Sequence, residues 1–478
     1  MGARARRAAG TAAGLAALAA ITVAAVPAGR DAERRTHAVA PGESPIASIQ
    51  DASLVTAPDP AARLRLMAGL GVRLVRVDLL WDQVARRRPA DPRNPADPAY
   101  DWARYDRIVA GARAARVQIL FTVWGTPAWA ADPAVPASRR FPARATRPRD
   151  PADFGRFGAA VVRRYAPRGV TRYEAFNEPN LPLFLRPQFE RRGGRWVATS
   201  PAVYSAMLTS FYREAKAANR RVLIGGGVTA PAGESCPVSC PDGADDRVAP
   251  LDFLAALDAS GLRPPMDAYT HHPYPLTRPR TDSVDGVSFI DLYNMGDLQK
   301  RLDATYLAGK PLWLTEIGFA TRPVAEYRFA VAEPDQARLL ADAYARVRAN
   351  PRVEILTWYL LQDHPAWTSG LLTETGRRKP AATAFQLPLA AAPAASGAPT
   401  RRLLGQVRVA PGATRVTVER LAGRRWRPVA TPRTTSDGSF AVTVGARTDI
   451  RYRAVWRGRD RQGRTRTLVS PAVTVRID

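Results

Sequence analysis

The chain has 478 residues, of which 46% are hydrophobic and 24% are charged, so its composition excludes an intrinsically disordered protein. The length predicts two or three domains. The formal net charge is +27, but only four of the 70 basic residues are lysines, and the arginines are scattered along the chain. Because no nucleic-acid-binding motif accompanies this charge, we expect no nucleic-acid partner, and association with an anionic cell envelope is left open.

The first 28 residues have the pattern of a secretory signal peptide. A basic segment, Met1–Arg7, precedes a small-residue apolar stretch, Ala8–Val26, and Ala28 offers a cleavage site. An uncleaved membrane anchor is the alternative, because the stretch approaches the ~20 residues that a membrane span needs. We therefore expect an extracellular protein that is secreted or associated with the cell envelope.

Short apolar runs alternate with longer amphipathic segments between residues 40 and 387, which predicts parallel strands covered by helices. We expect strands at Ile46–Gln50, Val72–Asp78, Gln118–Trp124, Arg172–Asn177, Arg221–Gly226, Ala268–His272, Leu312–Glu316 and Glu354–Leu360. We expect helices at Ala61–Leu70, Trp102–Ala115, Pro151–Tyr165, Pro201–Asn219, Leu251–Ala259 and Pro334–Asn350. Eight strand–helix units predict an α/β fold of the (β/α)8 TIM-barrel type.

The rest of the chain predicts a second domain. Residues 388–400 are almost entirely Ala, Pro, Gly and Ser, which indicates a linker or a loosely docked connector. Residues 401–478 alternate apolar and polar positions between turn signals, which predicts a small all-β, immunoglobulin-like sandwich. Its two tryptophans, Trp426 and Trp456, favour a packed core over a glycan-binding surface, and so a structural or spacer role.

The only two cysteines, Cys236 and Cys240, are four positions apart. In an exported chain this spacing predicts one local disulfide that shapes a loop. A metal site would need further ligands nearby, and the neighbouring sequence has no His or Cys cluster.

Two carboxylates follow apolar runs that have the character of buried strands. The run 172–176 ends in Asn177-Glu178-Pro179, and the run from Pro311 ends in Thr315-Glu316-Ile317-Gly318. Each run predicts a strand that delivers a carboxyl group to the mouth of the barrel, where barrel enzymes carry their chemistry. A pair of carboxylates at two strand ends is the arrangement that a retaining glycosidase needs.

With these motifs the chain resembles clan A of the glycoside hydrolases, and most nearly family 39 and the cellulase-like families. The resemblance covers roughly residues 40–390. It depends on Phe176-Asn177-Glu178-Pro179-Asn180, Trp313-Leu314-Thr315-Glu316-Ile317-Gly318, Val75-Arg76-Val77-Asp78, Gly125-Thr126-Pro127-Ala128-Trp129 and His272-Pro273-Tyr274, together with Gly370-Leu371-Leu372 and Lys379-Pro380-Ala381-Ala382. It implies a retaining enzyme on a (β/α)8 barrel.

The retaining mechanism assigns the two catalytic roles. Glu178 would be the general acid and base, and Glu316 the nucleophile, with their carboxyl groups about 5–5.5 Å apart. Arg76, at the end of a strand, is the candidate cation that keeps Glu316 charged. Glu174 lies on the same strand as Glu178 but further back, so we expect it deeper in the barrel.

The resemblance also implies residues that bind the sugar. Asn177 would bind the sugar 2-hydroxyl, Tyr274 would hydrogen-bond the nucleophile, and His272 would complete the polar ring. Trp358 would form the platform beneath the sugar next to the cleavage point. One or two of the tryptophans near the mouth would line sugar subsites, and Trp124 is our choice among Trp81, Trp124, Trp129 and Trp367.

These expectations together describe a retaining glycosidase that hydrolyses a β-linked poly- or oligosaccharide without a metal or organic cofactor. The alternative is a catalytically inactive barrel that binds glycan or scaffolds the cell envelope. The motifs leave open the sugar, the linkage, the choice between internal and terminal cleavage, and the oligomeric state.

Overall fold

The computed structural model describes residues 44–137, 140–233, 243–259, 261, 263–275, 289–323, 329–392, 399–445 and 449–475. The expected signal peptide and the expected disulfide between Cys236 and Cys240 lie outside these residues. Among the helices in the described ranges, none combines the length and the apolar character required to cross a membrane.

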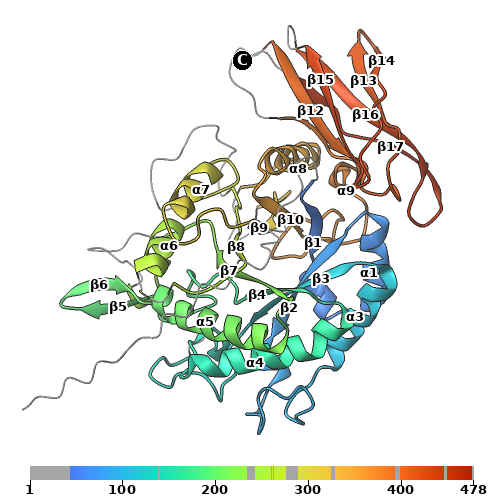
Figure 1. The fold of residues 1–478 in the computed structure, drawn as a ribbon. Helices are drawn as coiled ribbons and strands as arrows, with labels where there is room; N and C mark the ends of the chain where they lie inside the picture. Colours follow the sequence, from blue (N-terminus) through green and yellow to red (C-terminus); the bar gives the residue numbers. More distant parts are fainter. Residues whose placement is uncertain are drawn as a thin grey trace, which may run out of the picture. The chain divides into compact units, whose positions relative to one another are not determined.

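Eight parallel strands close into a barrel, as the sequence predicts (Figure 1). Around the barrel the order is β1-β10-β9-β8-β7-β4-β3-β2. The strands are β1 (Ile46–Gln50), β2 (Leu74–Leu80), β3 (Gln118–Trp124), β4 (Arg172–Ala175), β7 (Leu223–Thr229), β8 (Ala268–His271), β9 (Leu312–Ile317) and β10 (Val353–Tyr359).

The helices that accompany the barrel within the described residues are α1 (Pro60–Gly69), α2 (Trp81–Val84), α3 (Ala103–Ala115), α4 (Pro151–Tyr165), α5 (Ser200–Ala218), α6 (Pro250–Ala259), α7 (Met295–Asp303), α8 (Glu333–Arg348) and α9 (Pro380–Gln386). Local chemistry sets where two of them begin. Asp59 and Asp150 cap α1 and α4 by accepting a backbone N–H hydrogen bond, and each cap is followed by proline at the first helical position.

Three differences from the expected elements have local causes. Strand β4 ends at Ala175 rather than Asn177, because Phe176 takes a positive φ of 78° and turns the chain out of the strand. Helix α7 was not expected, although its buried residues Met295, Leu298 and Leu302 follow helical spacing. The segment after β4 contains a hairpin, β5 (Phe189–Arg192) and β6 (Arg195–Ala198), whose turn is two glycines with positive φ.

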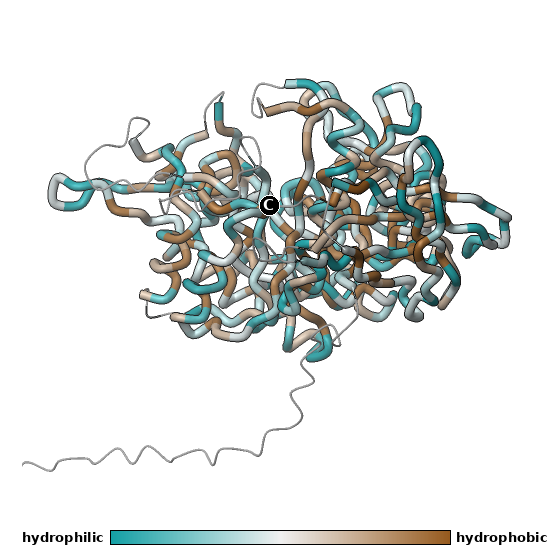
Figure 2. The backbone as a smooth tube through the Cα atoms, turned by 90° about the horizontal axis from the view of Figure 1, so that it is seen from above, coloured by the Kyte–Doolittle hydropathy of each residue, from teal (hydrophilic) through white to brown (hydrophobic). Residues whose placement is uncertain are grey.

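The barrel interior has an apolar layer at its N-terminal end. Leu74, Leu120, Ala268, Trp313 and Ile355 are buried together there. The larger hydrophobic core lies between the strands and the helices. Hydrophobic segments accordingly gather inside the molecule, while outer loops are mostly hydrophilic (Figure 2). Towards the C-terminal ends of the strands the interior becomes polar, and this polar region forms the candidate site.

The C-terminal region is all-β, as expected, and has two antiparallel sheets. The first has the order β11 (Leu389–Ala391), β12 (Thr400–Gln406) and β15 (Ser439–Gly445). The second has the order β14 (Arg425–Ala430), β13 (Thr417–Ala422), β16 (Ile450–Arg459) and β17 (Thr465–Val469), with β18 (Val473–Val475) also paired to β16.

The prediction of a linker over residues 388–400 is wrong for the first part of that segment. Leu389–Ala391 forms strand β11, which pairs with Leu403–Gly405 of β12. Ala390 is buried with Leu404 and with Ala341 of α8. The small side chains of this segment, which led us to expect a loose connector, allow it to pack closely instead. In the second sheet Trp456 is 1% exposed and lies in the core, whereas Trp426 is partly exposed and stacks under the guanidinium of Arg453.

Candidate active site

A cavity of about 670 Å³ opens at the C-terminal ends of the barrel strands. Both expected catalytic carboxylates line it, and so do aromatic and polar side chains from several strand ends. Among its lining residues are Gln50, Asp78, Trp124, Asn177, Glu178, Phe184, Tyr274, Glu316, Tyr359 and Trp367. Residues from five of the eight barrel strands therefore converge with loop residues on one volume, as the topology of a parallel barrel requires.

Arg76 of β2 is the centre of the polar network below this cavity. Its side chain is fully buried, and its Nε donates to Oε2 of Glu174 at 2.7 Å. Its Nη2 donates to Oδ1 of Asn177 at 2.8 Å, and its Nη1 donates to both Gln50 and Glu316. One planar guanidinium therefore holds side chains from β1, β4 and β9 and from the turn after β4 in fixed positions.

The charges of this network are mutually stabilising. Burial opposes the charge on Arg76, but the carboxylates of Glu174, Glu316 and Asp78 outweigh it, so the pKa of Arg76 is raised. Burial also acts to raise the pKa of Glu174, yet Arg76 more than compensates and the pKa is lowered. Glu174 is therefore a buried anion that keeps Arg76 in place, deeper in the barrel than Glu178, as expected from its position on β4.

Glu178 follows β4 in a strained turn that directs it into the cavity. Phe176 and Glu178 have positive φ values of 78° and 39°, in a region that residues other than glycine rarely adopt. Phe176 is buried against Phe154, which anchors the turn. Oε1 of Glu178 lies 2.7 Å from Nδ1 of His272, a hydrogen-bond distance.

His272 is fully buried, and burial lowers its pKa to about 4. The imidazole is therefore neutral at pH 7. Depending on the tautomer, it can donate a hydrogen bond to the ionised Glu178 carboxylate or accept one from the protonated carboxyl group. The neighbouring His271 lies on the other face of the chain, where it contacts Thr229 and the carbonyl of Ile290. The alternation of side chains along a strand accounts for this difference.

Glu316, on β9, receives two hydrogen bonds from groups that stay in one protonation state. Arg76 donates to Oε1, and Tyr274 Oη donates to Oε2 at 2.9 Å. Burial raises the pKa of Tyr274, which keeps the phenol protonated as a donor. Burial also raises the pKa of Glu316, and Arg76 is among the groups that oppose this shift. His272 and Arg76 are thus the groups that favour the carboxylate form of Glu316 against burial, and Arg76 is the one in direct contact with it through a permanent charge.

The two carboxyl groups are close together. Ligand atoms of Glu178, His272 and Glu316 all lie within 4.8 Å of one another, so one oxygen of each carboxylate is within that distance. Retaining glycosidases have carboxyl groups about 5–5.5 Å apart, and inverting enzymes about 6.5–9.5 Å. Three such ligand atoms could in principle hold a cation, but the Arg76 guanidinium in contact with Glu316 opposes a second positive charge there.

Asp78 and Trp124 form one wall of the cavity. Oδ1 of Asp78 accepts from Trp124 Nε1 at 3.0 Å, and Oδ2 accepts from Gln50 Nε2 at 3.0 Å. Phe184, from the loop after β4, packs edge-on against Trp124 with ring centroids 5.1 Å apart. This wall therefore presents a carboxylate next to aromatic surface.

The expected role of Trp358 is wrong. Trp358 is 2% exposed, is not among the cavity residues, and donates from Nε1 to the carbonyl of Ser369 at 2.9 Å. On β10 it points outwards to the helices and contacts Phe319, while its neighbour Tyr359 points into the cavity. Tyr359 and Trp367 pack edge-on at 5.6 Å and supply the aromatic surface expected of Trp358.

Of the four tryptophans expected near the mouth, Trp124 and Trp367 line the cavity, whereas Trp81 and Trp129 pack against each other. Sequence reasoning missed Gln50 and Tyr359. Both are the last residue of a barrel strand, so a survey of polar and aromatic residues at strand ends would have found them.

Comparisons with known proteins agree with the fold. No protein-family model matches the sequence, and no curated protein matches it either. Among solved structures, the chain is similar to a glucosidase from Croceicoccus marinus, with a TM-score of 0.50 and 17% identity over 85% of this chain and 95% of that chain. It is also similar to a GH30 endoxylanase from Clostridium papyrosolvens, with a TM-score of 0.43 and 13% identity over 85% and 96% of the two chains. At these identities the likeness concerns the barrel fold alone.

Proposed function

We propose that this protein is a retaining glycoside hydrolase that cleaves an O-glycosidic bond of a β-linked glycan. The observation that carries the proposal is the pair of carboxyl groups, Glu178 and Glu316, within 4.8 Å of each other at the C-terminal mouth of the barrel. Their environments differ as the two roles require, since the nucleophile must be ionised and the general acid must carry a proton. Glu316 is held by Arg76 and Tyr274, and Glu178 by a neutral imidazole.

In the first step an oxygen of Glu316 attacks the anomeric carbon, and the bond from that carbon to the leaving oxygen breaks as Glu178 protonates that oxygen. In the second step Glu178 removes a proton from water, the water oxygen bonds to the anomeric carbon, and Glu316 leaves as a carboxylate. Tyr274 and Arg76 stabilise Glu316 in the charged form that begins and ends this cycle.

The remaining lining supports a sugar as the substrate. Asp78 and Asn177 can accept hydrogen bonds from hydroxyl groups, and Trp124 and Trp367 offer apolar ring faces. The cavity of about 670 Å³ is large enough for more than one sugar ring. A carboxylate at Asp78 favours a neutral sugar over a uronic acid at that wall, because two like charges there would repel.

The test is a comparison of Glu178→Gln and Glu316→Gln on β-linked aryl glycosides with activated leaving groups. With Glu178→Gln the second step stalls, and added azide restores turnover and yields a β-glycosyl azide. With Glu316→Gln turnover is lost and azide does not restore the same product. Glu374→Gln, an exposed carboxylate outside the cavity, is the matched control and keeps wild-type rates.

An inverted product, or wild-type protein that retains a β-glycan but releases no sugar from a panel of β-linked substrates, would contradict the proposal. The second of these outcomes identifies the inactive glycan-binding barrel. We also propose export, supported by the sequence pattern of residues 1–28. N-terminal sequencing of the protein from culture medium tests this, with a new terminus directly after Ala28 as the expected result.

A further inference from the structure

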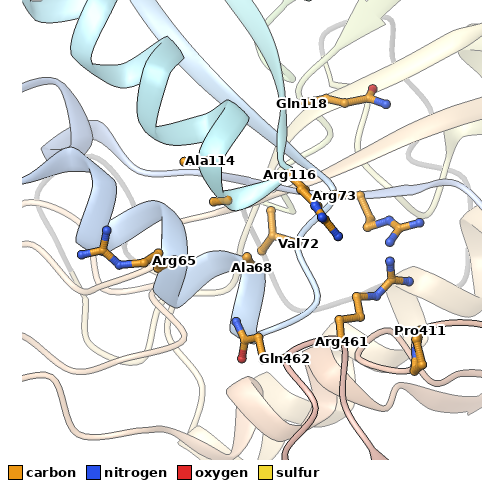
Figure 3. Close-up of a pocket in the computed structure, with 11 residues that line it drawn as sticks. Arg65, Ala68, Val72, Arg73, Ala114, Arg116, Gln118, Pro411, Arg461 and Gln462 are labelled. Carbon is orange, nitrogen blue, oxygen red and sulfur yellow. The ribbon is translucent and has the colours of Figure 1, made fainter.

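A second large cavity, of about 690 Å³, lies at the opposite end of the barrel from the candidate active site. Figure 3 shows the side chains that line it. Its walls come from α1, the segments that enter β2 and β3, and two loops of the C-terminal β region. Among the residues that the structure describes, four arginines line it, Arg65, Arg73, Arg116 and Arg461, and no acidic residue does.

Three of these guanidinium groups converge. Arg73, Arg116 and Arg461 point towards one another from two barrel segments and the loop between β16 and β17 (Figure 3). All three side chains are exposed to solvent, and within the described residues we find no side-chain hydrogen bond or ion pair for any of them. Burial lowers the pKa of Arg73, and the charge of Asp437 opposes this shift without cancelling it. The like charges of the three guanidinium groups around one concave volume repel one another, and an anion bound between them would relieve that repulsion.

Two smaller cavities adjoin this one. A cavity of about 230 Å³ shares Arg73 and Arg461 and adds the buried Arg408. A cavity of about 370 Å³ shares Arg65 and adds Arg378, Arg464 and Arg466, of which the last two are ion-paired with Asp460. We call the three cavities the basic track. Of the described residues that line it, Asp437 is the single acidic one.

The chemistry of the basic track narrows the kind of anion. Guanidinium groups bind carboxylate, sulfate and phosphate groups through paired hydrogen bonds. None of the described residues that line the track is aromatic, so these residues give the bases of a nucleic acid no stacking surface. Gln118 and Gln462 add amide donors and acceptors suited to hydroxyl groups.

We propose that the basic track binds an anionic polysaccharide, a glycan chain that carries carboxylate or phosphate groups. The row of three joined cavities fits a chain with repeated charges better than a single small ion. Because the track lies at the N-terminal ends of β2 and β3, a bound glycan occupies a site separate from the cavity that contains Glu178 and Glu316. The protein thereby acquires a point of attachment to acidic polymer that leaves the cavity with Glu178 and Glu316 open.

Isothermal titration of the full chain tests the proposal, with polygalacturonate and poly(glycerol phosphate) as anionic probes and laminarin as the neutral one. The wild-type protein is expected to bind at least one anionic probe, with affinity that falls as salt rises from about 50 to about 500 mM. The triple variant Arg73→Gln/Arg116→Gln/Arg461→Gln is expected to bind it about tenfold or more weakly.

The matched control is Arg195→Gln/Arg220→Gln/Arg424→Gln, which removes the same charge from exposed positions outside the track and should bind within about twofold of wild type. Should the first triple variant fail to fold, Arg461→Gln alone, in an exposed loop, is expected to weaken binding about threefold. Equal losses in both triple variants, no binding of either anionic probe, or equally tight binding of oligo(dT) or poly-glutamate would overturn the proposal.

Discussion

Replacement of Arg76 by Met should be among the most damaging single substitutions in the barrel. Both side chains of the Arg76–Glu174 pair are 0% exposed, so the variant leaves a buried carboxylate without its cation. Removal of one partner from a buried ion pair typically costs about 3–5 kcal/mol of unfolding free energy. Asn177 and Gln50 lose a hydrogen-bond donor in the same step. We expect a loss in that range, measured by urea unfolding monitored by tryptophan fluorescence.

The double variant Arg76→Met/Glu174→Gln distinguishes loss of the pair from loss of side-chain volume. Without the orphaned charge it should be more stable than Arg76→Met by about 2 kcal/mol, a coupling expected of side chains in direct contact. Arg338→Met is the control, because Arg338 and Asp335 are 56% and 53% exposed and such a pair contributes about 0.5 kcal/mol or less. The reasoning is refuted if Arg76→Met loses less than about 1 kcal/mol, or if removal of Glu174 gives no recovery.

Arg76 should also control the pH dependence of activity. Burial raises the pKa of Glu316, and Arg76 opposes this shift. Arg76→Met should therefore move the acid limb of the kcat/KM profile to higher pH, because Glu316, as the proposed nucleophile, must be ionised in the free enzyme. Arg76→Lys keeps the charge but not the paired hydrogen bonds, and its acid limb should lie between the other two. An acid limb that does not move in Arg76→Met would show that Glu316 is not the group that titrates.

Three further predictions concern His271 and the tryptophans Trp358 and Trp367. Burial lowers the pKa of His271 to about 3 and that of His272 to about 4, while an unfolded chain has histidines near 6.5. The unfolded state therefore binds these protons first, and their stabilising contribution is complete above about pH 6.5 and falls as the pH drops towards 4 and 3. His271→Gln should flatten the pH dependence of the urea midpoint in that window. An unchanged pH dependence of the midpoint would contradict a lowered pKa of His271 in the folded state. Trp358→Phe should cost about 1–2 kcal/mol of stability, because the Ser369 carbonyl loses its donor, with KM unchanged. Trp367→Ala should raise KM severalfold with little change in stability, measured on the same substrate, and equal KM values for these two tryptophan variants would contradict the corrected assignment.

The sequence predicts the barrel and its two carboxylates well because both follow from strong local signals. Buried parallel strands are apolar runs, and a polar residue directly after such a run must lie at the C-terminal edge of the sheet. Glu178 and Glu316 obey this rule. The expected position of Arg76 at the end of its strand is wrong, because β2 runs from Leu74 to Leu80 and Arg76 is only its third residue, below the cavity. Helix α4 is predicted to the residue because Asp150 and proline mark its start.

The direction of side chains at strand ends is harder to predict. A shift of one residue moves a side chain to the other face of a strand. Trp358 and Tyr359 are both large aromatic residues, so either could pack against the helices or line the cavity. Which of them points inwards depends on the register between β10 and its neighbours β1 and β9, and local sequence carries no signal for that register. Trp367 follows the strand in a loop, so its position depends on tertiary contacts with Tyr274 and Tyr359.

The polar centre of the barrel explains why stability and chemistry cannot be separated at Arg76. A buried ion network is rarely the most stable way to fill a core, since apolar side chains of similar volume often do as well or better. Here the same guanidinium that neutralises Glu174 also contacts Glu316 and orients Asn177. An apolar replacement of the whole network would leave Glu316 buried without a cation, and burial would then favour its protonated form. A centre that is costly to desolvate is therefore what the proposed role of Glu316 requires, because a nucleophile at this position has to be both buried and charged.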